Sequence, residues 1–309
     1  DDDRCVDLLV GQDTERHDLI YKGNCDGSFQ DVGMDWGLSS SSVHGVEETM
    51  CFAVFDFNGD LIYDVLKTNS NGRGAPLHQG SRHNLLDRVF RDVGSSLGLL
   101  DNHFNWGCWY GDFDYNRTYD LVWASARPSP GSKQHDKEVP GSKQHHEEVN
   151  RGVSFFDQLF WNTGYDFVPA NQDGRLIKNG IEKDGFGLVV GDIVGYSGDR
   201  IVSADGKLDV LVTNLDQEPL LYVNRGNVGN YIAVNLIGEG NNMQSIGSKV
   251  RMIVDKKCPS EQQVLSGGSY ASDSTRKLYF GLGKNTSARF SVQTQYKDSC
   301  ETEELEANS

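Results

Sequence analysis

Two nine-residue segments, 56–64 and 112–120, carry oxygen-bearing side chains at the same spacing. Aspartate or asparagine occupies positions 1, 3, 5 and 9 of each segment. Carboxylates packed this closely repel one another, so the pattern predicts a hard cation, and Ca²⁺ tolerates an irregular oxygen cage better than Mg²⁺ does. The predicted ligands of this structural calcium are the side chains of Asp56, Asn58, Asp60, Asp64, Asp112, Asp114, Asn116 and Asp120 and, at position 7, the main-chain oxygens of Ile62 and Thr118.

Two other structural motifs could explain part of this spacing of aspartates and asparagines. An EF-hand needs a glutamate at position 12 and a helix on each side, whereas here position 12 is Lys67 or Trp123 and the flanking residues are strand-like. A pair of Asx-rich turns without metal is the remaining alternative, because Asp and Asn favour turns in any case. Recurrence at one place in a repeat favours calcium.

Two further segments contain an incomplete version of the pattern. Positions 3, 5 and 9 are Asp1, Asp3 and Asp7 in the first of them. Positions 1, 5 and 9 are Asp192, Asp205 and Asp209 in the second, where an insertion at 194–198, with Asp199 beside it, interrupts the loop. The sequence does not decide whether these two loops bind metal.

No recognised catalytic constellation is present. The chain lacks the G-x-x-x-x-G-K and H-E-x-x-H motifs, and we predict no nucleophile elbow, although the G-x-S-x-G spacing occurs once, at 94–98. The segment 145–148 reads His-His-Glu-Glu, and with His135 it offers a weak transition-metal site as the alternative to a solvated loop. Paired carboxylates of a glycosidase cannot be told from cation ligands without geometry, so a hydrolase is the residual alternative to a protein that is not an enzyme.

Internal repeats supply the elements that must position these loops. The pattern F-x-D-V-G-x-x-x-G-L occurs at 29–38 and again at 90–99. Strand-like segments at 19–21, 159–162 and 221–224 also match one another. An aspartate opens a short apolar run at Asp7, Asp64, Asp120 and Asp209. The longest interval between these aspartates contains a polar insertion at about 127–150 with a ten-residue duplication, which we expect to be a mobile surface loop.

The repeats predict an all-β fold. Each contains several runs of β-prone residues between Gly, Asn and Asp turns, and few segments have the 3.6-residue spacing of a helix. One antiparallel sheet per roughly 60 residues is typical of propeller blades; a β-sandwich would not explain the period. We expect a small or incomplete propeller over 1–228, with the innermost strand of its first blade missing and its ring closure undecided.

A different pattern begins near Asn230. Alternating strands at 231–236, 249–254 and 289–293 predict a smaller, sandwich-like β-module over 229–300. The residues 301–309 form an acidic tail, which we expect to be disordered.

Six cysteines, none of them in a C-x-x-C pair, predict up to three disulfides in an oxidising compartment. Six buried thiols in a cytosolic protein are the alternative. Fifteen pairings are possible. Positions at strand ends and in turns favour Cys258 with Cys300 and Cys5 with Cys25, which leaves Cys51 with Cys108.

Two acceptor sequons, at Asn116 and Asn285, fit a secreted glycoprotein. Glycosylation of Asn116 would compete with its role as a ligand, so we expect the glycan on Asn285. The first residues have no basic head and no apolar run, and we expect the numbering to begin at a processed, mature end.

The loops and the strands that follow them resemble the FG-GAP/VCBS repeats of integrin-α-type β-propellers. The C-terminal module resembles the ASPIC/UnbV domain of cartilage acidic proteins, on the segments 245–250, 266–270 and 277–283. This resemblance implies a secreted, calcium-binding, glycosylated propeller with no established catalytic role. The chain departs from the family in its few repeats, its broken fourth loop and its His-rich insertion.

Charge and composition narrow the classes of function and of partner that we expect for this chain. Among 309 residues, 29 are Lys or Arg and 45 are Asp or Glu, giving a net charge of −16, which disfavours nucleic acid as a partner. No apolar run approaches the ~20 residues of a membrane helix. We expect a secreted, non-enzymatic binding or matrix protein with an extracellular partner, as a monomer or as a homo- or hetero-oligomer.

A carrier of a lipophilic ligand or pigment, such as a carotenoid, is the alternative function. It depends on aromatic residues near strand starts and loop ends, whose alternative role is packing in the core. These residues are Trp36, Trp106, Trp109, Trp123, Trp161, Phe52, Phe55 and Tyr110.

Overall fold

The computed structural model describes residues 3–13, 16–39, 47–70, 74–82, 88–99, 104–126, 157–170, 184–197, 200–254, 257–294, 300–301 and 304–308. Asp1, Asp199 and the insertion with His135 and 145–148 lie outside the described residues.

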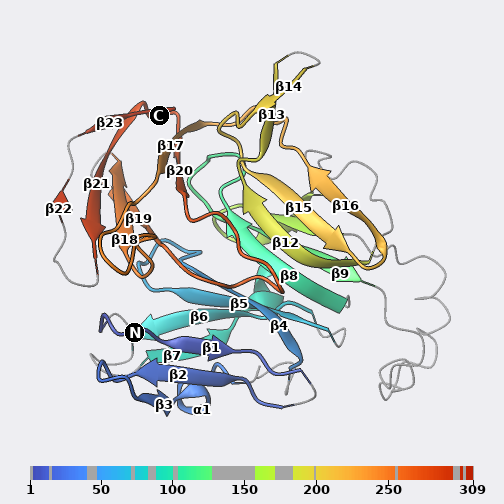
Figure 1. Cartoon of the computed structure of the whole chain (residues 1–309), viewed down its shortest axis with the longest axis vertical. Coiled ribbons are helices and arrows are strands. Elements are labelled where there is room, and N and C mark those ends of the chain that lie inside the picture. The colour runs from blue at the N-terminus through green and yellow to red at the C-terminus, as the bar shows by residue number, and fades with distance from the viewer. Residues whose placement is uncertain are drawn as a thin grey trace.

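The repeat region consists of small antiparallel sheets whose strands follow one another in chain order (Figure 1). The first sheet contains β1 (Leu8–Val10), β2 (Leu19–Gly23) and β3 (Phe29–Asp31). The second contains β4 (Thr49–Phe55), β5 (Asp64–Asn69), β6 (Leu77–Arg82) and β7 (Arg88–Asp92). The third contains β8 (Phe104–Gly111), β9 (Asp120–Ala126), β10 (Gln158–Asn162) and β11 (Phe167–Pro169). The fourth contains β12 (Gly185–Gly191), β15 (Asp209–Asn214) and β16 (Gln217–Tyr222), with a separate hairpin of β13 (Val194–Ser197) and β14 (Arg200–Ser203).

The sequence repeats coincide with these sheets. The aspartates at 64, 120 and 209 each open the second strand of a sheet, β5, β9 or β15. In the first sheet the equivalent strand is β1, and no strand pairs with its other edge among the described residues.

The first strands of the second, third and fourth sheets lie side by side. A disulfide joins Cys51 of β4 to Cys108 of β8, with Cα atoms 5.8 Å apart. On the other side of β8, a Cβ on Gly107 would stand 2.7 Å from the main-chain oxygen of Phe186 in β12. The sheets therefore extend outward from a shared line of inner strands, but the described sheets do not close into a ring.

Second strands are buried on both faces because they lie between neighbouring sheets. Every described side chain of β5 and β9 is buried. The core between the second and third sheets includes Phe55, which stacks on Tyr110 with centroids 4.7 Å apart, and Trp123, which stacks on Phe160 at 4.6 Å. Each such side chain contributes about 1.5–3 kcal/mol when fully buried, and the expected packing role of these aromatics is confirmed.

The repeated F-x-D-V-G-x-x-x-G-L segments form an outer strand followed by one helical turn. These turns are α1 (Gly33–Trp36) and the 3₁₀ helix η1 (Gly94–Leu97). Both end on a left-handed glycine, Gly37 or Gly98. A Cβ on either would stand 2.6 Å from a main-chain oxygen of the next sheet, that of Phe90 or Phe167. Glycine is thus needed both for its positive φ and for this close approach.

The C-terminal region forms a β-module with its own core, and its expected strands are confirmed. In it β17 (Asn230–Val234) pairs with β20 (Leu278–Gly283), and β18 (Lys249–Val254) lies between β19 (Lys257–Gln263) and β21 (Ser287–Gln293). Two short strands, β22 (Cys300–Glu301) and β23 (Leu305–Glu306), also pair with β21. The expectation of a disordered tail was wrong for 304–308, because β21 offers backbone partners to this segment.

The module docks on the repeat region through the segment 266–275. The main-chain oxygen of Gly268 accepts a hydrogen bond from the N–H of Phe52 in β4, at 3.0 Å, and the N–H of Thr275 donates to the oxygen of Val190 in β12, at 3.1 Å. This segment therefore crosses the inner strands of three sheets and covers them.

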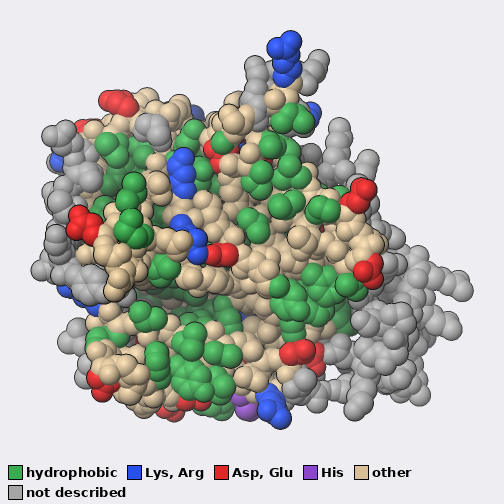
Figure 2. Space-filling model, viewed as in Figure 1, with side chains coloured by type: hydrophobic (Ala, Val, Ile, Leu, Met, Phe, Trp, Pro, Cys, Tyr) green, Lys and Arg blue, Asp and Glu red, His purple; other side chains and the backbone are tan. Residues whose placement is uncertain are grey.

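The surface in Figure 2 shows scattered charged side chains and apolar groups over the first sheet. Val6, Leu8 and Phe29 are exposed there. Within the described residues, no helix has the length and apolar character needed to cross a membrane.

Candidate metal centre

The loop 112–120, which connects β8 to β9, brings three carboxylates together. One oxygen each from Asp112, Asp114 and Asp120 lies within 4.8 Å of the other two. Asp112 and Asp120 are fully buried at 1% and 0% exposure, whereas Asp114 is half-buried. Among the described residues this is the one cluster of three acidic, His or Cys ligands with such spacing.

Backbone hydrogen bonds fix the conformation of this loop. Asp112 accepts the N–H of Asn116 on Oδ1, at 2.9 Å, and the N–H of Arg117 on Oδ2, at 2.8 Å. The chain can reach these positions because Tyr115 and Arg117 adopt left-handed φ values of 56° and 84°. Such φ values cost energy in a residue other than glycine and are typical of functional sites.

The electrostatics of the cluster favour a cation. Burial raises the pKa of Asp112 well above its usual range, and the neighbouring Asp114 carboxylate raises it further. Burial also raises the pKa of Asp120, as does the charge of Asp112. A divalent ion among these oxygens would replace the lost hydration and remove the repulsion.

The loop 56–64 reproduces this geometry bond for bond. Asp56 accepts the N–H groups of Asp60 and Leu61, at 3.1 and 2.8 Å, and Gly59 and Leu61 have left-handed φ values of 75° and 62°. Burial raises the pKa of Asp64 to about 8. The carboxylates of this loop do not come as close together as those of 112–120.

The aspartate at position 9 has a second role that the sequence analysis missed. Asp64 accepts the N–H of Phe57 on Oδ2, at 2.9 Å, and the N–H of Gly80 on Oδ1, at 2.8 Å. The second bond ties β5 to β6. The equivalent bonds link Asp7 to Gly23, Asp120 to Asn162 and Asp209 to Asn224. In all four sheets of the repeat region this aspartate therefore ties the strand that it opens to the next strand or to the residues just after it, whether or not a metal binds.

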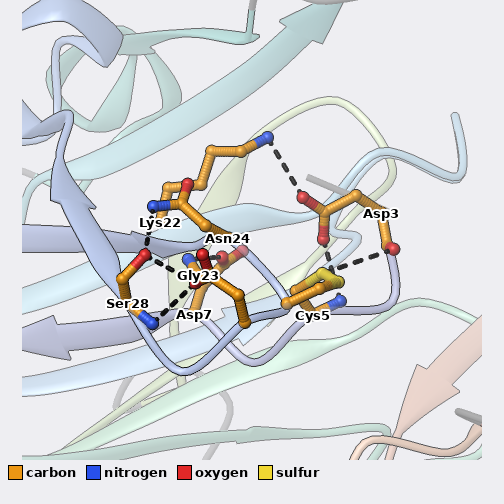
Figure 3. Close-up of a disulfide and its surroundings, with 9 residues drawn as sticks. Asp3, Cys5, Asp7, Lys22, Gly23, Asn24 and Ser28 are labelled. Carbon is orange, nitrogen blue, oxygen red and sulfur yellow. Dashed lines mark hydrogen bonds and ion pairs between the residues drawn. A yellow bond between two sulfur atoms is a disulfide. The ribbon is translucent and has the colours of Figure 1, made fainter.

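The first loop has a different positive partner. The carboxylate of Asp3 lies 3.1 Å from the ammonium of Lys22, beside the disulfide between Cys5 and Cys25 (Figure 3). Asp7 accepts the N–H of Gly23 at 3.0 Å. In this repeat a lysine side chain places a positive charge beside Asp3, and metal binding by Asp1, Asp3 and Asp7 stays undecided.

The fourth loop uses its aspartates to hold the inserted hairpin. Asp192 accepts the N–H groups of Asp205 and Gly206, each at 2.9 Å, and Asp209 accepts those of Ile193 and Val194, each at 3.0 Å. The hairpin β13–β14 thus separates position 1 from position 5 without changing their connection.

One asparagine connects each of the two candidate metal loops to the next sheet. The side-chain amide of Asn162 donates to the main-chain oxygen of Phe57, at 3.2 Å, and that of Asn224 donates to the oxygen of Phe113, at 2.8 Å. The matching segments 159–162 and 221–224 gave a sequence signal for these residues but not for their role.

The loop 112–120 also contacts the C-terminal module. The main-chain oxygen of Tyr115 accepts the N–H of Gly283 at 2.8 Å, and its ring stacks on Tyr231 with centroids 4.9 Å apart. Gly281 lies against Asp112 and Tyr115 so closely that a Cβ would overlap both. The candidate metal centre therefore lies at the interface of the two parts of the chain.

Two of the three predicted cysteine pairs agree with the structure, Cys5 with Cys25 and Cys51 with Cys108. The side chains of Cys258 and Cys300 lie outside the described residues, and their pairing stays a prediction. Their strands, β19 and β22, stand at opposite edges of one sheet, separated by β18 and β21.

The two sequon asparagines differ in exposure. Asn116 is exposed, and its side-chain nitrogen donates to Asp114 at 3.1 Å. Asn285 is half-buried and donates to the main-chain oxygen of Leu282 at 2.9 Å. Glycosylation of either residue stays a prediction.

A hollow adjoins the same loop. It has a volume of about 380 Å³, and its walls include Phe113, Asp114, Trp161, Asn224 and Val228. Trp161 is thus one predicted aromatic that lines a cavity, in contrast to the buried Trp123.

Residues 238–307 match the family described as ASPIC and UnbV. The match confirms that the C-terminal module resembles an ASPIC/UnbV domain, and it extends into the segment that contains β22 and β23. No curated protein matches the chain.

Proposed function

We propose that this protein is an extracellular, calcium-stabilised binding protein whose repeat region is a small FG-GAP/VCBS-type β-propeller. The observation that carries the proposal is the cluster of three carboxylates at Asp112, Asp114 and Asp120, two of them fully buried. Asp112 and Asp120 are held by backbone N–H groups, so their oxygens stay in place when the metal leaves.

The ion would be held in loop 112–120 by the side chains of Asp112, Asp114, Asn116 and Asp120 with the main-chain oxygen of Thr118. The loop 56–64 offers the equivalent donors. Bound Ca²⁺ supplies two positive charges to a buried anionic site and no redox or hydrolytic chemistry. The residues of loop 112–120 would then connect the inner strands and hold the loop against Tyr231 and Gly281.

Two features support a partner-binding role: the disulfides and the position of the calcium loops. The two disulfides fit an oxidising, extracellular compartment. The calcium loops sit at strand connections, where a rigid scaffold positions neighbouring loops for a protein or matrix partner.

Direct metal binding tests the proposal. Calcium titrated calorimetrically into the chelator-treated protein should release or absorb heat, and magnesium should compete poorly. Asp112→Asn and Asp114→Asn should each weaken binding at one site, whereas Asp166→Asn, an exposed aspartate outside the loops, should leave the titration unchanged. Absence of calcium binding to the folded protein would contradict the proposal.

The second candidate function is transport of a small lipophilic ligand. The hollow of about 380 Å³ beside Phe113, Trp161 and Val228 favours it, because ligand sites are commonly 300–1,000 Å³ in volume. Native mass spectrometry and a visible spectrum of protein purified from its source distinguish this function, since a bound chromophore or lipid would be detected directly.

A further inference from the structure

Lys67 is a buried cation that faces two buried carboxylates. Its Nζ lies 3.0 Å from Oδ2 of Asp18, 2.6 Å from Oε2 of Glu47 and 2.5 Å from the main-chain oxygen of Leu38. The side chains of Lys67, Asp18 and Glu47 are 0%, 1% and 1% exposed. Two carboxylates beside one ammonium leave a net negative charge where water is excluded, which is costly for a purely ionic arrangement.

The two carboxyl groups have different surroundings. Asp18 is fully engaged: its Oδ1 accepts the N–H of Gln12 at 3.0 Å, and its Oδ2 accepts the hydroxyl of Thr49 at 2.8 Å. Glu47 keeps one buried oxygen, Oε1, that has no hydrogen-bond partner among the described residues. Burial raises the pKa of Glu47 to about 7 although Lys67 lowers it. A carboxyl group of this kind can both accept and return a proton near neutral pH.

We propose that Lys67 and Asp18 condense into an intramolecular amide cross-link, with Glu47 carrying the proton. One proton of the ammonium passes to Oδ2 of Asp18, which leaves a neutral amine and a carboxylic acid. The lone pair of Nζ then forms a bond to Cγ of Asp18. A second proton passes from Nζ through Glu47 to Oδ2, the Cγ–Oδ2 bond breaks, and water leaves.

The condensation is balanced without any other reactant. Of the three protons on Nζ, two leave in the water and one remains on the amide nitrogen, and Glu47 ends in its starting state. The N–H of Gln12 is placed to stabilise the negative charge that develops on Oδ1 during the attack. Folding supplies the proximity of the reacting groups, and the near-complete burial of the side chains of Lys67, Asp18 and Glu47 excludes water.

The cross-link would join the first sheet to the second, across 49 residues of sequence. Asp18 directly precedes β2, and Lys67 lies in β5. The disulfide between Cys51 and Cys108 joins the second sheet to the third in the same way. Together the two bonds would connect three sheets covalently without relying on a closed ring.

Intact mass tests the proposal directly. The folded wild-type protein, then denatured and reduced, should be lighter than its sequence by the mass of one water. Proteolysis should release a branched peptide that contains both Asp18 and Lys67. A native-like protein with the full sequence mass and with separate Asp18 and Lys67 peptides would overturn the proposal.

Variants test the assigned roles. Lys67→Arg keeps the cation but removes the nucleophile, and Glu47→Gln removes the proton carrier, so both should have the full mass. Glu48→Gln is the matched control, because Glu48 is also buried but accepts from Ser70, and it should keep the loss of water. Asp18→Asn, if it condenses, should lose ammonia instead. Circular dichroism and a thermal melt show that each variant is folded, and a Glu47→Gln protein that is folded and still cross-linked would overturn the role of Glu47.

Discussion

The side-chain amide of Asn224 donates a hydrogen bond to the main-chain oxygen of Phe113, 2.8 Å away, across the boundary between the fourth and third sheets. Phe113 is the second residue of the candidate metal loop. Because the same aspartate–loop–asparagine connection recurs at Phe57 and Asn162, the conformation of each metal loop is coupled to the packing of the next sheet.

Loss of this bond should destabilise the protein measurably. Asn224→Ala leaves the buried oxygen of Phe113 without its partner, which costs about 1–3 kcal/mol. Urea unfolding followed by fluorescence measures the change. Asn227→Ala, an exposed asparagine in the same loop, is the matched control and should change stability by no more than about 0.5 kcal/mol. Equal effects of the two substitutions would contradict the role of Asn224.

Calcium should stabilise the folded protein by mass action. At a free calcium concentration about 100 times the dissociation constant, the gain is about 2.7 kcal/mol per site. A chelator should therefore lower the melting temperature of the wild type and should have a smaller effect on Asp56→Asn/Asp112→Asn. If the chelator shifts both proteins equally, the stabilising ion is not bound in these loops.

The coupling of the metal loop to the C-terminal module predicts the effect of a single methyl group. In Gly281→Ala the Cβ would meet Asp112 and the backbone of Tyr115, so β20 and the loop would have to separate. We expect lower stability and weaker calcium binding together. In Gly191→Ala the nearest new contact, with Thr275, is an ordinary 3.6 Å, so this control should keep calcium binding. Normal calcium affinity in folded Gly281→Ala would show that the interface and the metal site are independent.

The loops and strands that recur along the chain could be predicted from the sequence, whereas the contacts between residues far apart in the sequence could not. The spacing of Asp112, Asp114 and Asp120 is local, so the loop and its strands could be inferred from it. The contact between Asn224 and Phe113, 111 residues apart, depends on how whole sheets pack. The docking of Gly281 on Asp112 likewise joins distant parts of the chain, and no linear pattern encodes it.

A buried aspartate away from the metal loops predicts a pH dependence of stability. Burial raises the pKa of Asp157 from 3.8 to about 6, against the lowering effect of hydrogen bonds from Tyr222 and Ser125. The folded state therefore holds this proton more tightly than the unfolded state does, and stability should fall as the pH rises from about 4 to about 6. A shift of two units corresponds to about 3 kcal/mol. The difference in stability between the wild type and Asp157→Asn, measured by urea unfolding, should change by this order over that range; a constant difference would contradict the assignment.

The two disulfides should differ in their contribution to stability. Cys51 and Cys108 close a loop of 57 residues, and Cys5 and Cys25 close one of 20. The chain-entropy model then gives the longer loop about 1 kcal/mol more stabilisation. Cys51→Ala/Cys108→Ala should accordingly unfold at a lower temperature than Cys5→Ala/Cys25→Ala. Non-reducing peptide mapping should recover both pairs, and it also decides the predicted bond between Cys258 and Cys300. Three strand spacings, roughly 14 Å, separate β19 from β22, so that bond would require β22 to leave its place beside β21.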